Sequence, residues 1–226
     1  MDDEALAAAL HDDALRGLRR INALSFTARA LWKPIQEFAR AAGRPIRVLD
    51  IATGGGDAPI AMSQFARKAG VAVSFSGCDK SAVALEFAAR RAKELGADVR
   101  FFRLDILTES IPEQYDVIVN SLFLHHLDPE DVVRVLVKLQ TARMALVSDL
   151  RRSGGGLLLA YVATRVLSRS PVVHTDGPRS VRAAYTLPEM RQLAQQSGMT
   201  EFSLEGQWPC RQLLKWIRCP HKTDSA

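Results

Sequence analysis

The stretch VLDIATGGGD, from Val48 to Asp57, decides how the rest of the chain is interpreted. Its apolar start predicts a buried strand that ends at a carboxylate, Asp50, and its small residues predict a tight turn that leads into a helix. Small residues let a ligand lie against bare backbone, and a helix N-terminus offers unpaired N–H groups to polar or anionic groups. The stretch therefore predicts a binding turn of the kind that many nucleotide sites share.

Two common nucleotide-binding turns do not fit this stretch. A dinucleotide fingerprint requires G-x-G-x-x-G, but Pro59 stands where the third glycine would follow Gly54 and Gly56. A P-loop requires Gly-Lys followed by Ser or Thr, and this turn has no such sequence. What remains is an acid on the strand followed by D-x-x-x-G-x-G. We expect Asp57 to be the N-cap of the next helix and Pro59 to lie in its first turn.

Four further strand-like segments follow, over 71–79, 100–105, 115–121 and 144–150. The first two also end in an acid, Asp79 and Asp105. Helical patterns near 58–69, 82–95 and 129–141 lie between them. Strands that alternate with helices predict an α/β fold with a parallel sheet and right-handed crossovers.

This ordered set of strand-end acids resembles that of the class I S-adenosylmethionine-dependent methyltransferases, over roughly residues 46 to 218. The resemblance implies a Rossmann-like, seven-stranded, mostly parallel sheet with helices on both faces. We expect an N-terminal helical cap over 1–43, a methyltransferase domain over 44–221 and a tail over 222–226. One departure is Ala52, where many members carry the first glycine, although alanine also occurs there in the ubiquinone/menaquinone C-methyltransferase branch.

The segments outside the alternating core are predicted from their periodicity and composition. Residues 2 to 42 should be helical throughout, with Pro34 as a boundary or kink. After the fifth strand we expect a helix/loop lid insertion at about 151–186, made of an apolar helix over 156–168 and an irregular stretch over 171–185. A helix over 187–197 and strands near 200–206 and 211–218 should close the domain.

The resemblance implies S-adenosylmethionine as the cofactor, S-adenosylhomocysteine as the product, and no metal. Asp50 would order the glycine turn and the methionine end of the cofactor. Asp79 would accept hydrogen bonds from both ribose hydroxyls, because a carboxylate has two acceptor oxygens and no donor; Ser81 is then free to cap the following helix. The expected cofactor-binding residues are Asp50, Ala52, Thr53, Gly54, Asp79, Lys80, Asp105, Ile106, Asn120 and Ser121.

Three of these residues would meet the adenine end. The resemblance implies that Asp105 accepts from the exocyclic amine and that Ile106 offers its backbone N–H and its side chain to the ring. Lys80 either extends into solvent or stacks on the adenine.

The segment from Asn120 to His126 bears on the methyl acceptor. Enzymes that methylate exocyclic amines of nucleobases or glutamine carry Asn/Asp-Pro-Pro-aromatic here, whereas this chain has Asn-Ser-Leu-Phe. Ligands of open α/β sheets bind at the carboxyl ends of the strands, so His125 and His126 should lie near the reacting methyl. A histidine with a pKa near ~6.5 can take the proton of a phenol. Alternatively, the two histidines cap the turn before Pro129 and pack under the cofactor.

The irregular stretch is a second candidate for acceptor chemistry. His174 with Asp176 would form a base and its orienting carboxylate, and Arg179 would steer an acidic acceptor. Alternatively, the polar side chains of this loop satisfy its own backbone. The expected catalytic residues are thus His125, His126 and His174, and the expected substrate-pocket residues are Trp32, Phe123, Asp176, Arg179 and Tyr185.

These motifs favour O-methylation of a small aromatic or lipid-tailed acceptor, of phenol, quinol or polyketide type, by direct in-line displacement. Carbon methylation of an electron-rich ring needs the same pocket and stays open. RNA or protein methylation fits less well, because the Pro-Pro-aromatic motif is missing. A non-catalytic cofactor-binding module is disfavoured by the intact set of strand-end acids.

Composition excludes several kinds of partner and site but does not assign a function. The formal charge of +5 comes from 30 Lys and Arg against 25 Asp and Glu, and its short arginine clusters lack interleaved aromatics, so no nucleic-acid partner is expected. Three cysteines in unrelated contexts support neither a disulfide framework nor a zinc site. The longest apolar run is far shorter than the ~20 residues of a membrane span. We expect a cytoplasmic monomer or homodimer.

Overall fold

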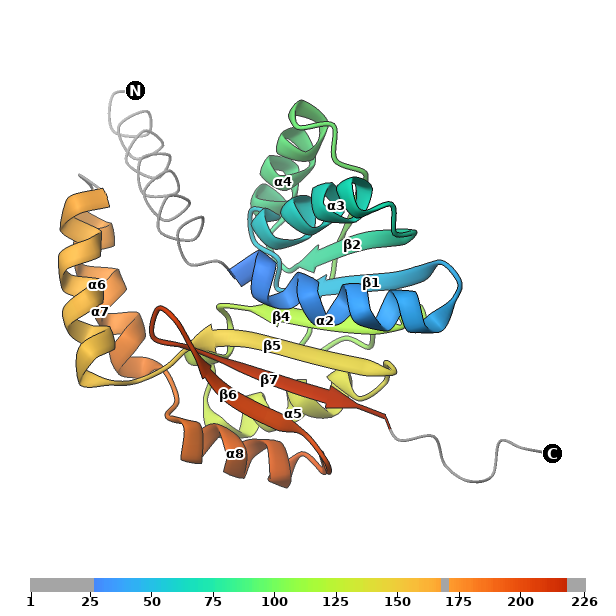
Figure 1. Ribbon diagram of the computed structural model, residues 1–226. Helices are drawn as coiled ribbons and strands as arrows, with labels where there is room; N and C mark the ends of the chain where they lie inside the picture. The colour runs from blue at the N-terminus through green and yellow to red at the C-terminus, as the bar shows by residue number, and fades with distance from the viewer. Residues whose placement is uncertain (1–26, 168–170, 219–226) are drawn as a thin grey trace.

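The computed structural model describes residues 27–167 and 171–218. Seven strands form one sheet in the order β3-β2-β1-β4-β5-β7-β6. Strands β1 to β5 pair in parallel, and β7 pairs antiparallel with both β5 and β6. Figure 1 shows α2 and α3 on one face of this sheet and α5 and α8 on the other, with α6 and α7 standing apart beside the carboxyl ends of the parallel strands. The Rossmann-like fold predicted from the sequence is confirmed.

The elements follow the predicted alternation. The strands are β1 (Ile46–Ile51), β2 (Val73–Asp79), β3 (Val99–Arg103), β4 (Val117–Ser121), β5 (Met144–Leu150), β6 (Ser203–Gln207) and β7 (Arg211–Ile217). The helices are α2 (Thr27–Ala42), α3 (Asp57–Ala69), α4 (Ala82–Glu94), the 3₁₀ turn η1 (Leu124–His126), α5 (Pro129–Leu139), α6 (Gly154–Leu167), α7 (Pro171–Ala183) and α8 (Leu187–Gln196).

Two hydrophobic cores hold the layers together, one on each face of the sheet. The first joins α2 and α3 to β1, β4 and β5, with Leu31, Ile35 and Met62 fully buried. The second joins α5 and α8 to the opposite face, with Leu136 and Leu139 fully buried. Burial of such side chains stabilises the fold by about 1.5–3 kcal/mol each. The strand ends are therefore held on a rigid scaffold, as a binding site at that edge requires.

Three local predictions need comment. Pro34 is not a helix boundary, because α2 runs through it from Thr27 to Ala42. Its side chain is buried in the packed face of this helix. Asp57 is not the N-cap: Gly56, with φ of 72°, holds that position, and Asp57 begins α3 and pairs with Arg91. Ser81 caps α4 as predicted, because its hydroxyl accepts a hydrogen bond from the Ala84 amide at 3.2 Å. The predicted helix over residues 2–26 lies outside the described residues.

The predicted irregular stretch over 171–185 is wrong, because most of it is helix α7. Gly177 and Pro178 within this segment favoured a loop when the sequence was considered alone. In the structure, Gly177 lets α7 approach α6 closely, and a Cβ at that position would stand 2.4 Å from Thr164 Cγ2. Tertiary packing against α6 therefore overrides the local signal, and the insertion after β5 is a helical hairpin.

We expect Gly177→Ala to force α6 and α7 apart and to lower the melting temperature by about 3–10 °C, since overpacking costs about 1–3 kcal/mol. Combining it with Thr164→Ser removes the clashing methyl and keeps the hydroxyl that donates to Ala160 O. The double variant should regain most of the lost melting temperature in a thermal scan. Equal melting temperatures of the single and double variants would show that the contact between Gly177 and Thr164 does not hold α6 and α7 together.

Candidate active site

The glycine turn after β1 adopts the conformation that a close ligand approach requires. Ala52 and Gly54 have φ of 50° and 52°, in the left-handed region. This region favours glycine over residues with a Cβ, which explains why glycine is common at the position of Ala52. The Thr53 amide donates to Cys78 O at 2.9 Å, so the turn is fixed to the end of β2. The backbone of the turn leads directly into the N-terminus of α3.

Asp50 lies beneath this turn, 1% exposed, at the end of β1. The Thr53 hydroxyl donates to its Oδ2 at 2.6 Å, so Asp50 orders the turn, whereas the buried Oδ1 has no hydrogen-bond partner among the described residues. Burial raises the pKa of Asp50 to about 7. An unsatisfied, desolvated carboxylate at a strand tip is what a polar or cationic ligand group would complement.

The raised pKa of Asp50 makes stability depend on pH. The unfolded chain loses this proton near pH 3.8 and the folded chain near pH 7, so the folded state binds more protons between these values and its stability falls as pH rises through them. The difference between these two pKa values corresponds to on the order of 4 kcal/mol. We therefore expect Asp50→Asn to stabilise the ligand-free protein more at pH 8 than at pH 5 in urea unfolding. An equal effect at both pH values would contradict this.

Asp79 ends β2 and ties the glycine turn to the start of the next connection. Its Oδ2 accepts from the Gly54 amide at 2.8 Å and its Oδ1 from the Ser81 amide at 2.9 Å. Each oxygen of a carboxylate can accept a second hydrogen bond, and the side chain is only half-buried. Asp79 can therefore hold the turn and a vicinal diol at the same time. Lys80 beside it is exposed.

Asp105 and Ile106 lie just beyond the end of β3. Asp105 Oδ1 accepts from the Leu107 amide at 3.0 Å, which leaves Oδ2 for a ligand donor. Ile106 is 4% exposed and packs into the core with α5, so little of its side chain is free to meet a ring. The Lys138 ammonium donates to Ile106 O at 2.5 Å and fixes this turn. The Asp105 carboxylate is therefore more available to a ligand than the Ile106 side chain is.

Asn120 and Ser121 end β4, next to β1. The Asn120 side chain is fully buried and its Nδ2 donates to Ile51 O at 3.0 Å, which joins the two strand tips. Its Oδ1 is buried without a hydrogen-bond partner among the described residues. Ser121 is half-buried beside it. Asp50 and Asn120 thus each leave one acceptor oxygen unsatisfied where β1 and β4 meet.

His125 is joined to Asp149, a residue that the sequence interpretation missed. The His125 imidazole Nδ1 lies 2.7 Å from Asp149 Oδ1, and the His125 amide donates to Asp149 Oδ2 at 3.0 Å. Both residues are buried, at 6% and 1% exposure. A carboxylate at Nδ1 requires a proton on that nitrogen, which leaves the lone pair of neutral histidine on Nε2. The pair has the arrangement of a general base and its orienting carboxylate.

His126 has a different environment from its neighbour. Its ring centroid lies 4.0 Å from that of His125, but the residue is exposed. Partial desolvation of the ring and the adjacent His125 lower the pKa of His126, whereas Asp149 and Asp176 act in the opposite direction. Helix α7, which carries Asp176, packs on η1.

The predicted pairing of His174 with Asp176 does not fit the structure. Both lie on α7 two positions apart, and helix positions i and i+2 do not face each other. Arg179 lies three positions beyond Asp176 and is exposed like it, so these two share a face of the helix. The structure therefore separates His174 from the carboxylate that was expected to orient it.

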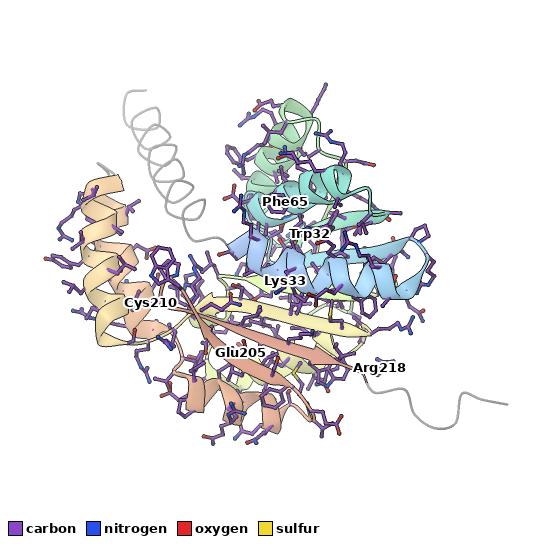
Figure 2. All side chains as sticks on the ribbon, in the orientation of Figure 1. Trp32, Lys33, Phe65, Glu205, Cys210 and Arg218 are labelled. Atoms are coloured by element: carbon purple, nitrogen blue, oxygen red, sulfur yellow. The ribbon has the colours of Figure 1, made fainter. Side chains whose placement is uncertain are left out.

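The remaining predicted pocket residues are partly taken up by packing. Trp32 is 9% exposed and lies with Phe65 where α2 meets α3, as Figure 2 shows, so it contributes mainly to that core. Phe123 is half-buried and precedes η1. The Tyr185 hydroxyl donates to Leu127 O at 2.7 Å and fixes the turn that follows His126.

Comparison with known proteins agrees with this arrangement. Residues 48–142 match the family described as "Methyltransferase domain". No curated protein matches the chain in sequence. The match covers the glycine turn and all three strand-end acids.

Solved structures with the same fold include several methyltransferases. A putative O-methyltransferase from Nostoc punctiforme PCC 73102 is 20% identical with a TM-score of 0.63, over 86% of this chain and 56% of that one. Magnesium protoporphyrin IX methyltransferase from Synechocystis PCC 6803, with bound S-adenosylhomocysteine, is 17% identical with a TM-score of 0.59, over 92% and 86%. The plantazolicin methyltransferase in complex with a desmethyl analogue and S-adenosylhomocysteine is 18% identical with a TM-score of 0.62, over 96% and 91%.

The chain thus spans little more than half the length of the Nostoc protein. Its fold is that of these methyltransferases, and residues 48–142 carry the match to the methyltransferase-domain family. Within residues 27–167 and 171–218, no group of three or more His, Cys, Asp or Glu side chains is placed to hold a metal ion. No helix of this part of the chain is long and apolar enough to cross a membrane.

Proposed function

We propose that this chain transfers the methyl group of S-adenosylmethionine to a hydroxyl oxygen of a small aromatic acceptor of phenol, quinol or polyketide type. The observation that carries the proposal is the buried His125–Asp149 pair beside the strand tips that form the cofactor turn. Such a pair supplies a base where a hydroxyl would meet the methyl group, which a mere cofactor-binding module would not need.

The cofactor would lie across the tips of β1, β2 and β3. In this arrangement Asp79 accepts from the ribose hydroxyls, Asp105 accepts from the adenine amine, and Asp50 with Asn120 faces the methionine end. The unsatisfied Asp50 Oδ1 and Asn120 Oδ1 support this placement, because a ligand with donor groups would complete their hydrogen bonding. The cofactor itself supplies a methyl group already activated by the sulfonium charge.

The residues of the chain would then align the acceptor and move one proton. His125 Nε2 takes the hydroxyl proton as the new carbon–oxygen bond forms and the carbon–sulfur bond breaks, and Asp149 stabilises the imidazolium that results. Charge on the reacting atoms is dispersed during the transfer, so an enclosed site favours it. We propose that the α6–α7 hairpin encloses the acceptor, with Phe123 as an apolar wall and Asp176 and Arg179 on the facing helix.

Labelled methyl transfer tests this proposal. The protein is incubated with methyl-labelled S-adenosylmethionine and a panel of catechols, resorcinols and quinols, with bulk RNA and protein as competing acceptors. Transfer to the phenolic compounds alone supports the proposal, and product NMR separates an O-methyl from a C-methyl group. Preferential labelling of RNA or protein would overturn it.

A further inference from the structure

A second buried charge lies at the same edge of the sheet and takes no part in the chemistry above. Arg211 begins β7 and is 5% exposed. Its Nη1 is buried without a hydrogen-bond partner among the described residues. Burial lowers the pKa of Arg211 to about 10, still high enough to keep the guanidinium charged at pH 7. A buried cation without a partner is costly for a fold to keep.

One carboxylate acts on the charge of Arg211 without a hydrogen bond to it. Asp149 is the carboxylate whose charge acts on the guanidinium. Both oxygens of Asp149 are already engaged: Oδ1 by the His125 imidazole and the Leu150 amide, and Oδ2 by the His125 amide. Arg211 therefore keeps donor capacity that no described side chain uses.

The register of the strands places Arg211 on the same face as other unsatisfied polar groups. Asp50 pairs with Val119, Ser121 with Ser148, and Ser148 with Leu213. Because side chains alternate along a strand, one face carries the row Asp50, Ser121, Ser148 and Arg211. The hydroxyl of Ser148, which is 1% exposed, is also buried without a partner among the described residues. It lies diagonally from Arg211, within about 7–8 Å across the strand pair.

The position of Arg211 in the sheet separates it from the cofactor. Three strand spacings, from β1 through β4 and β5 to β7, lie between the glycine turn and Arg211. At ~4.8 Å per spacing this is roughly 14 Å. The carboxylate of the cofactor would lie at the tip of β1 and is therefore too far away to pair with Arg211. An anion at Arg211 would instead be part of a second molecule, one that lies over β4, β5 and β7.

We propose that Arg211, with Ser148, binds a carboxylate of the methyl acceptor and anchors it at the end of the pocket remote from the methyl group. The inference rests on the proposed function and narrows the substrate class to an aromatic acid. A guanidinium presents five donors in a planar fork that matches a carboxylate. The Ser148 hydroxyl adds one donor. Arg211 is thus a specificity residue, and His125 acts on a different part of the acceptor.

The test compares acids with their methyl esters. Protein loaded with S-adenosylhomocysteine is melted with hydroxybenzoates and hydroxycinnamates, each beside its neutral methyl ester, and the same pairs serve in methyl-transfer assays. We expect wild-type protein to be protected by at least one acid but not by its ester. Arg211→Gln should weaken binding of that acid about 10- to 150-fold. The kcat/KM for the ester should fall far less than that for the acid, because the ester has no charge for Arg211 to bind.

The variants are chosen so that a folding defect is visible. Lys215→Gln removes the same charge on the same strand and should retain acid-specific protection. Arg211→Lys should retain part of the acid-specific protection. Arg211→Gln without ligand should melt at or above the wild-type temperature, because it removes an unpaired buried charge.

The possible failures can be told apart. Loss of S-adenosylhomocysteine binding or of all methyl transfer in the wild type would defeat the proposed function. Equal protection by acids and esters, no protection by any acid, or a lower melting temperature of Arg211→Gln with an unchanged acid-to-ester ratio would overturn the role of Arg211 while the proposed function stands.

Discussion

Replacement of His125 by alanine is expected to lower kcat for a phenolic acceptor about 10²- to 10⁴-fold at pH 7, the range typical of a lost general base. The loss should shrink as pH approaches 10, because the phenol then ionises without help. Asp149→Asn should also lower kcat, but less than His125→Ala does, because His125 is retained and lacks only the carboxylate that fixes its tautomer. The measurement is kcat for wild type and variants between pH 6 and 10.

His126→Ala is the matched control for this experiment. His126 follows His125 directly and its ring is tilted 43° against that of His125, but it is exposed and has no carboxylate at hydrogen-bond distance among the described residues. Its replacement should change kcat less than tenfold, a threshold set below the usual effect of a base. A larger loss for His126→Ala than for His125→Ala would move the base to His126. A pH-independent loss for His125→Ala would assign it to positioning instead.

Replacement of Asp79 by alanine should weaken cofactor binding about 10²- to 10⁴-fold. Two hydrogen bonds from a ribose diol to a charged acceptor contribute about 1.5–3 kcal/mol each. The same change also frees the amides of Gly54 and Ser81, to which the carboxylate is bonded. Calorimetry with S-adenosylhomocysteine measures the dissociation constant directly, before any acceptor is known.

The control for Asp79 is a second acid near the turn. Asp57 begins α3 and pairs with Arg91 instead of facing the proposed ribose position. Asp57→Asn should leave the dissociation constant within about threefold, as expected for a surface charge. Thermal scans identify any variant that has lost the turn itself. A folded Asp79→Ala protein that still binds S-adenosylhomocysteine as the wild type does would refute the ribose assignment.

Much of the fold follows from local sequence signals. Short apolar runs such as those of β1 and β5 are typical of buried strands, and alternation with helices favours a parallel sheet. The helix cap at Ser81 was predictable because its hydroxyl precedes an apolar helical pattern. The ordered acids at Asp50, Asp79 and Asp105 predicted which strand tips would meet, because parallel strands end at one edge.

What escaped prediction depends on contacts between distant segments. Helix α7 contains Gly177 and Pro178, and the close approach of Thr164 on α6 to Gly177 could not be read from the sequence. Asp149 sits one residue before the end of a fifth strand, so its acid was visible in the sequence. Its partner His125 lies 24 positions earlier, and nothing local links the two. The burial of Arg211 was not predictable either, because it depends on the antiparallel pairing of β7 with β5.

The proposed assignments give the earlier and later parts of the chain different tasks. The match to the methyltransferase domain ends at residue 142, just before β5 begins at Met144. The proposed cofactor residues precede this point, whereas Asp149, Arg211 and the α6–α7 hairpin follow it. Evolution can therefore exchange the later segment for another and change which compound is modified, while the earlier segment continues to load the same methyl donor.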